Sequence, residues 1–186
     1  MRKLTACIAI LILLCGCSGK DPDFSSALML REAMLRGEKC KFQCSINADY
    51  ESYGYTFLLD CVADKNGRVE FSVLEPEPIS GISGYISAEK GAITFDDQVL
   101  AFPLLIDGAI TPVSAPWILI TALRSGYIYS AGSKGDLSLV SIEDEFFDQH
   151  LRVEIEIAKN NLPERAVIYW QGNAFLTLKI THFQIL

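Results

Sequence analysis

Residues 41–73 read KFQCSINADYESYGYTFLLDCVADKNGRVEFSV, and this stretch decides the fold. Apolar side chains stand at every second position before, between and after two turn sequences, Glu51–Gly54 and Asn66–Gly67. Such alternation is typical of strands with one buried face, and Asn-Gly between two strands is a strong signal for a two-residue hairpin. The stretch therefore predicts three consecutive antiparallel strands that share one apolar face.

The same alternation continues downstream, with short turns between the segments. Successive side chains of a strand point to opposite faces, so one half of each strand faces a common core. The further strands that we expect are residues 82–87, 92–95, 98–102, 127–130, 137–142, 151–157, 166–170 and 174–183. The side chains that we expect to point inward are Phe42, Ile46, Phe57, Leu59, Val69, Phe71, Val73, Val153, Ile155, Val167, Tyr169, Leu176, Leu178 and Ile180.

Two segments interrupt this period and have the features of helices. Phe24–Arg36 carries a broad apolar stripe and is followed by Gly37, which can end a helix. Trp117–Arg124 has Pro116 in its first turn and Ser114 as a candidate cap. The order of elements is thus one helix, a run of strands, one inserted helix and a second run of strands.

This order predicts an α+β fold with one large antiparallel sheet. A sheet of about ten strands does not stay flat, because its right-handed twist makes it curl. We therefore expect an open half-barrel whose concave face is covered by the N-terminal helix and the inserted helix. Residues 24–186 would form this single domain.

The first sixteen residues have the features of an export signal. Arg2 and Lys3 give a positive start, and Leu4–Leu14 is uncharged and mostly aliphatic. This apolar run is about half as long as a helix that crosses a bilayer. We therefore expect residues 1–16 to be absent from the folded domain.

The end of the signal, Leu14–Cys17, resembles a bacterial lipobox. The resemblance implies that the Cys17 thiol receives a diacylglyceryl group and that a peptidase cuts between Gly16 and Cys17. Residues 17–23 would then be a lipidated tether, and the palmitate-type chains would hold the protein to the bacterial membrane, outside the cytoplasm. The alternative is an ordinary secretory signal that contains cysteines.

Composition excludes several classes of function. The 186 residues include 16 basic and 23 acidic side chains, with a formal net charge of −7. Removal of Arg2 and Lys3 with the signal lowers this charge to −9. A chain of this sign lacks the clustered positive charge that nucleic acids require, so no nucleic-acid partner is expected. It is not drawn electrostatically to anionic lipids either, so the acyl chains must provide the attachment.

The predicted domain resembles the LolA/LolB lipoprotein-carrier superfamily and the related lipid-binding lipoproteins LppX and LprG. The resemblance is architectural and passes on no individual catalytic or ligand residue. It implies a cavity under the sheet that binds acyl chains or lipidated partners. The stretches that carry it are Ala27–Arg36 with Phe42, Tyr55–Asp60, Asn66–Gly67, Ser114–Tyr127 and Leu151–Phe183.

No motif for catalysis, cofactor binding or metal binding stands out. The sequence lacks a Gly-x-Ser-x-Gly elbow, a glycine-rich phosphate loop and a His-Glu-x-x-His motif. Of the two histidines, His182 is expected in the core or at an edge on the face of Leu178 and Ile180, and His150 in solvent. The acidic residues 143–148 are better explained as a solvated turn than as a Ca²⁺ loop. We expect no enzyme, no cofactor and no metal.

Cys44 and Cys61 lie in the first two predicted strands, and Cys40 directly precedes the first of them. If Tyr50 opposes Tyr55 across the first turn, Cys44 opposes Cys61. Exported cysteines more often pair than bind zinc, so this pair is the candidate disulfide. Cys40 is left over and is the rival partner for Cys61.

The most unusual stretch is Gly108–Leu123, which carries no charge. Either it closes the core, or it is a movable apolar lid over a lipid cavity with Leu105, Pro116, Trp117 and Ile118 at the rim. The first function that we expect is a non-enzymatic carrier or binder of lipid, acyl chains or lipidated partners. The alternative is a structural or sensory envelope protein of the same fold that acts through a protein partner.

Overall fold

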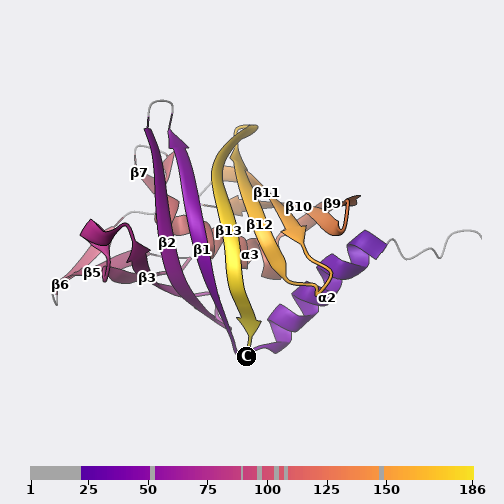
Figure 1. Ribbon diagram of the computed structural model, residues 1–186, viewed down its shortest axis with the longest axis horizontal. Helices are drawn as coiled ribbons and strands as arrows, with labels where there is room; N and C mark the ends of the chain where they lie inside the picture. The colour runs from indigo at the N-terminus through magenta and orange to yellow at the C-terminus, as the bar shows by residue number, and fades with distance from the viewer. Residues whose placement is uncertain are drawn as a thin grey trace, which may run out of the picture.

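The computed structural model describes residues 22–50, 53–88, 90–95, 98–102, 105–106, 109–146 and 149–186. An eleven-stranded antiparallel sheet dominates it, in the order β6-β5-β4-β3-β2-β1-β13-β12-β11-β10-β9. The first strand lies beside the last, and the end strands β6 and β9 do not pair with each other, so the sheet is open (Figure 1). The strands are β1 (Lys39–Tyr50), β2 (Tyr53–Asp64), β3 (Val69–Glu75), β4 (Ser83–Ile86), β5 (Gly91–Phe95), β6 (Gln98–Phe102), β9 (Tyr127–Lys134), β10 (Leu137–Phe146), β11 (Gln149–Ile157), β12 (Pro163–Trp170) and β13 (Asn173–Ile185).

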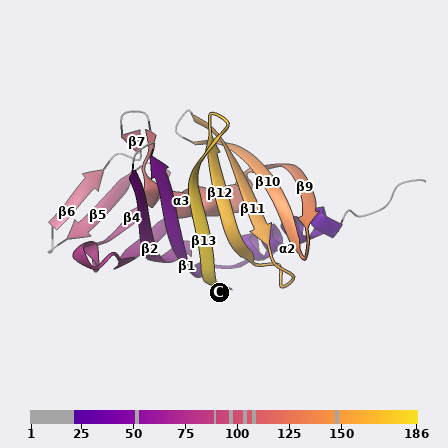
Figure 2. The same ribbon diagram turned by 45° about the horizontal axis from the view of Figure 1, so that its top comes forward.

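Two α-helices lie on one side of this sheet, α2 (Pro22–Arg36) and α3 (Ala115–Ser125). Figures 1 and 2 show α3 behind the middle strands and α2 near β9 and β10. The described residues also include two short 3₁₀ turns, η1 (Glu77–Ile79) and η2 (Pro112–Ser114). The predicted class, an α+β fold with a curled open sheet and two covering helices, is confirmed. None of the helices that the structure describes has the length and hydropathy of a membrane-spanning segment.

Both helices begin earlier than the sequence predicted. Pro22 and Asp23, assigned to the tether, belong to α2, and α3 starts at Ala115. Ser114 precedes α3 as expected, but it has helical backbone angles and its hydroxyl makes no cap. The hydroxyl instead lies 2.7 Å from Thr111 Oγ1, because a capping side chain needs an extended backbone to reach the first amides.

Two further differences concern strands. Leu105–Ile106 (β7) and Ala109–Ile110 (β8) form a separate two-stranded sheet that periodicity did not reveal. The acidic turn expected at residues 143–148 is wrong for Glu143–Phe146, which extends β10. The strand continues because Phe146 is buried and Glu143 faces Arg152 on β11. Asp144 lies opposite the buried Leu151, on the side of the sheet where α2 carries Arg31. Residues 147–148 lie outside the described part of the chain.

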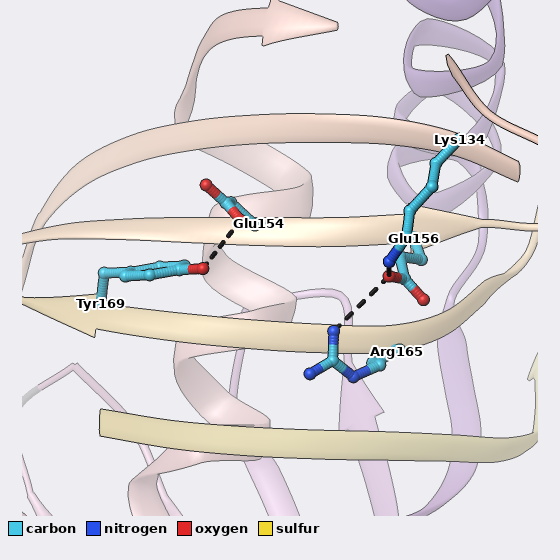
Figure 3. A network of polar contacts seen from close by, with 5 residues as sticks. All are labelled: Lys134, Glu154, Glu156, Arg165 and Tyr169. Carbon is cyan, nitrogen blue, oxygen red and sulfur yellow. Dashed lines mark hydrogen bonds and ion pairs between the residues drawn. The ribbon is translucent and has the colours of Figure 1, made fainter. Parts of the chain in front are cut away.

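The inner face of the sheet and α3 make one continuous apolar core. Most of the predicted inward side chains belong to it, but Val167 and Tyr169 were assigned to the wrong face. β12 pairs with β11 through Ala166↔Ile155 and Ile168↔Val153, which places Ala166 and Ile168 inward. Tyr169 lies on the face opposite α3 (Figure 3).

A bulge near the end of β13 changes which face its residues occupy. Here the pairing with β1 shifts register, and His182 has a φ of 53°, in the left-handed region. The buried position therefore passes to Phe183, which stacks on Phe42 at a centroid distance of 5.5 Å. His182 is exposed, so the expectation that it shares the face of Ile180 in the core is wrong.

Candidate functional site

Helix α3 fills the curl of the sheet and contains three of the predicted rim residues. Pro116, Trp117 and Ile118 are all buried, and Trp117 meets Phe146 edge-on at 5.6 Å. Eight of the eleven residues of the helix are buried. The fourth rim residue, Leu105, lies in β7, and its side chain is outside the described part of the structure.

Arg31 of α2 caps the C-terminal end of α3. Its Nε donates to Leu123 O at 2.8 Å, and one terminal nitrogen donates to Ala122 O at 3.1 Å and Gly126 O at 2.7 Å. The last carbonyls of a helix lack partners within the helix and carry partial negative charge, so a guanidinium is a suitable partner. Burial lowers the pKa of Arg31 from its ordinary value, and the charge of Asp144 opposes this shift.

A second arginine, Arg124, joins the same end of α3 to the turn between β2 and β3. It donates to Lys65 O at 2.6 Å and to Asp64 O at 3.2 Å. The Asp64 carboxylate in turn accepts from the backbone amides of Asn66 at 2.8 Å and Arg68 at 3.0 Å. The two arginines therefore connect α2, α3 and the sheet through charged hydrogen bonds.

The sequence analysis missed both arginines. A signal existed for each, since Arg31 interrupts an apolar helix and Arg124 is the only charged residue of α3. Their hydrogen-bond acceptors are backbone carbonyls up to 95 residues away in the sequence. A pattern of side chains cannot predict which carbonyl an arginine will reach.

The three cysteines are buried in the core, but their pairing differs from the prediction. Cys44 lies opposite Leu59 and Cys61 lies opposite Phe42, because Tyr50 faces Tyr53 and the register is shifted by two residues. Cys44 and Cys61 remain diagonal neighbours with their Sγ atoms 3.9 Å apart. All three are free thiols in the structure, and formation of a disulfide, with an S–S distance of about 2.05 Å, stays a prediction.

The environment of Cys40 and Cys61 favours the protonated form of their thiols. Burial raises the pKa of Cys40 to about 12, with Arg124 acting in the opposite direction. Burial, followed by the hydrogen bond with Cys44, raises the pKa of Cys61 well above its ordinary value. Because the thiolate is the reactive form, these cysteines are poor nucleophiles in the folded protein.

The outer face of the sheet carries paired charges on β9, β11 and β12 (Figure 3). Glu156 accepts from Lys134 at 2.8 Å and lies 3.5 Å from Arg165. The hydrogen bond from Lys134 lowers the pKa of Glu156, against the effect of its burial. Tyr169 donates to Glu154 Oε2 at 2.9 Å, and burial raises the pKa of Tyr169.

An open groove of about 730 Å³ lies beside this network, where β13 continues past the start of β12. Both charged and apolar side chains line this groove. The lining residues are Glu156, Asn160, Leu162, Pro163, Glu164, Arg165, Lys179, Ile180, Thr181, His182 and Phe183.

Three of the predicted rim residues lie away from the groove. Pro116, Trp117 and Ile118 line neither this groove nor two further hollows of about 360 and 350 Å³. An apolar gap under residues 108–123 stays a prediction.

Within the described ranges, no three His, Cys, Asp or Glu side chains gather as metal ligands would. The anchor residues Gly16 and Cys17 lie outside the described part of the chain.

Neither a family model nor any curated protein matches the sequence. Solved structures do match. A DUF1329 family protein from Desulfovibrio piger superposes with a TM-score of 0.51 at 8% identity, over 88% of this chain and 92% of the other. A LolA superfamily protein from Nitrosomonas europaea gives 0.45 at 10% identity, over 86% and 93%. The lipoprotein LppX of Mycobacterium tuberculosis gives 0.43 at 12% identity, over 89% and 95%.

The likeness is one of fold alone. Proteins of the two kinds that the sequence resembles, a LolA superfamily protein and LppX, are among the structures found. The predicted architecture, an open antiparallel sheet with two covering helices, is the one that the structure has.

Proposed function

We propose that this chain is a non-enzymatic lipoprotein of the bacterial envelope. In this proposal residues 1–16 direct export, a peptidase cuts after Gly16, and lipidated Cys17 anchors the domain outside the cytoplasm. The domain binds or carries lipid, acyl chains or lipidated partners under the curled sheet. The observation that supports it best is α3, an apolar helix placed inside the curl.

Helix α3 has the properties of a plug that an acyl chain can replace. Its buried side chains are apolar, so their contacts with the inner face of the sheet have no directional requirement. The charged hydrogen bonds from Arg31 and Arg124 are made at its C-terminal end. In the proposed mechanism this end acts as a hinge, and the end with Trp117 moves to admit a ligand.

The second candidate function is binding of a protein partner without a lipid ligand. It is favoured by the close packing of α3, where Ile118, Leu119 and Ile120 are fully buried. The open groove beside Glu156 and Arg165 has the mixed polar and apolar character of a protein-binding surface.

Native mass spectrometry of the purified protein, with organic extraction of what co-purifies, tests the first candidate. We expect a bound acyl lipid to appear as a discrete added mass and in the extract. Replacement of Trp117 by Ala should change the uptake of a fluorescent fatty acid more than it changes the circular dichroism of the sheet. Trp170→Ala is the matched control, because Trp170 is only half-buried and bonds Gln149 through its indole nitrogen at 2.9 Å. A protein that contains no lipid and takes up no acyl probe would leave the partner-protein function standing.

A further inference from the structure

Helix α2 has apolar side chains on two sides. One side, Ala27, Leu30 and Met34, is buried in the core. Another side carries Phe24, Leu28 and Leu35, with exposed fractions of 36, 54 and 56%, while Met29, 46% exposed, lies apart from these three. Leu28 and Leu35 stay more than half exposed, so this side lacks a cover in the described structure.

The exposed side chains form a compact stripe. At 100° per residue, Phe24, Leu28 and Leu35 fall within about 40° of one another, and they extend over about 16 Å of the helix. Charged groups border the stripe, since Glu32 and Arg36 form an ion pair at 2.6 Å beside it. This apolar centre with a charged border is the pattern of a helix that lies at an interface.

From this arrangement we infer that the stripe of Phe24, Leu28 and Leu35 lies on the lipid surface of the membrane to which the protein is anchored. The inference rests on the proposed lipidation of Cys17. Four residues separate Cys17 from Pro22, the first residue of α2. A chain of this length spans at most about 18 Å, so the start of the stripe cannot leave the neighbourhood of the bilayer.

Area, not charge, favours lipid over a second copy of the chain. The processed chain has a formal net charge of −9, so apolar contact, not electrostatic attraction, must hold the domain against an anionic surface. A stable dimer buries about 800 Å² on each partner, more than three partly exposed side chains can supply. A lipid surface requires no such area, because the acyl anchor already holds the protein there.

The contact would give the domain a fixed orientation. Arg31 lies on α2 next to the stripe and caps α3, so the membrane contact would lie one helix away from the proposed plug. The strand at the other end of the sheet, β6, would point away from the bilayer (Figures 1 and 2).

The test uses the lipidated protein in vesicles of phosphatidylethanolamine and phosphatidylglycerol, with a bimane probe on Leu28→Cys. The native cysteines Cys40, Cys44 and Cys61 are buried, so the new thiol labels selectively. The matched control is Val99→Cys on β6, where the side chain is 67% exposed. Vesicle flotation in the same samples reports the anchor separately from the orientation.

We expect brominated lipids to quench most of the bimane emission at position 28 and little at position 99. Bromines near the headgroups should quench more than bromines near the chain ends, because such helices sit only about 5–10 Å deep. Equal quenching at both positions in protein that floats with the vesicles would overturn the inference and keep the anchor. Protein that does not float would overturn both. If the bimane at position 28 is shielded from solvent without lipid, and more so at higher protein concentration, the stripe instead binds a second copy of the chain. The membrane inference would then be wrong.

Discussion

Helices α2 and α3 lie side by side under one sheet, yet they differ in how much of their apolar surface is exposed to solvent. Most of α3 is enclosed, with Ile118 and Leu119 fully buried, while α2 buries Leu30 and leaves Leu28 half exposed. Arg31 makes the connection between them, since it extends from α2 to the end of α3. The difference teaches that α3 belongs to the core and that α2 separates the core from an outside surface.

The largest expected effect concerns the lipid anchor, because the proposed contact between α2 and the membrane depends on it. Cys17→Ser removes the thiol that the lipid needs, so we expect an uncleaved and unlipidated precursor. Cleavage is read from the mobility of the chain, and lipid from incorporation of labelled palmitate. A lipoprotein signal-peptidase inhibitor should also block processing of the native chain.

The control for the anchor is Cys15→Ser, which changes a neighbouring cysteine and leaves Gly16 and Cys17 in place. It should be processed and lipidated normally. A Cys17→Ser protein that is cleaved and stays equally bound to membranes would show that the segment is an ordinary secretory signal.

The second prediction compares the two helices directly through stability. Ile118→Ala leaves a cavity in the core and should lower the free energy of unfolding by about 2–5 kcal/mol. Leu28→Ala removes a side chain that is 54% exposed and should change it by about 0.5 kcal/mol or less. Urea denaturation of the purified protein measures both. Similar losses for the two variants would mean that α3 is not part of the cooperative core.

Local pattern predicted the elements of this fold well, because alternation in β1–β3 depends only on which side of a strand is buried. Local pattern failed to predict the register of paired strands, because a turn that is one or two residues longer or shorter shifts every residue pair of the hairpin. The turn after Asp64 holds residues 65–67, with Gly67 at a φ of 82°, and is one residue longer than the predicted Asn-Gly turn. The first turn is shorter than predicted, since Tyr50 pairs with Tyr53, and this displaced the Cys44 partner by two residues.

The candidate site was harder to predict than the fold. The uncharged stretch contains most of α3, in which Pro116, Trp117 and Ile118 are buried, and their place at the rim of a cavity stays a prediction. The contacts of Arg31 and Arg124 join residues distant in sequence, and their acceptors are backbone carbonyls, which every residue has. No periodicity distinguishes such partners.

The third prediction tests the link between the helices. Arg31→Met removes the partly buried hydrogen bonds that the guanidinium donates to Leu123 O, Ala122 O and Gly126 O, so the protein should lose about 1–3 kcal/mol of stability. Arg36→Met is the matched control on the same helix, because its ion pair with Glu32 is largely exposed and such pairs contribute about 0–1 kcal/mol. Thermal or urea unfolding measures the difference. Equal effects would show that the guanidinium of Arg31 does not hold α3.

The smallest expected effect is a pH dependence of the free energy of unfolding. It reports how well the core beside α3 excludes water from Cys40. Cys40 has a pKa of about 12 in the folded protein, against 9.0 for an unperturbed thiol. A group whose pKa is raised by folding contributes its full stability below the unfolded pKa and loses it as the pH rises through the folded value. Stability should therefore fall between pH 9 and pH 12, by about 1 kcal/mol at pH 9.5.

Urea unfolding at pH 8 and pH 9.5 measures this fall, and Cys40→Ala should reduce it. The thiol itself gives an independent reading, because alkylation requires the thiolate. At pH 8 native Cys40 should react with iodoacetamide far more slowly than an exposed thiol placed on α2 by Leu28→Cys. Equal alkylation rates would mean that water reaches the core beside Arg124 as freely as it reaches the outer side of α2, and the contrast between the two helices would then be lost.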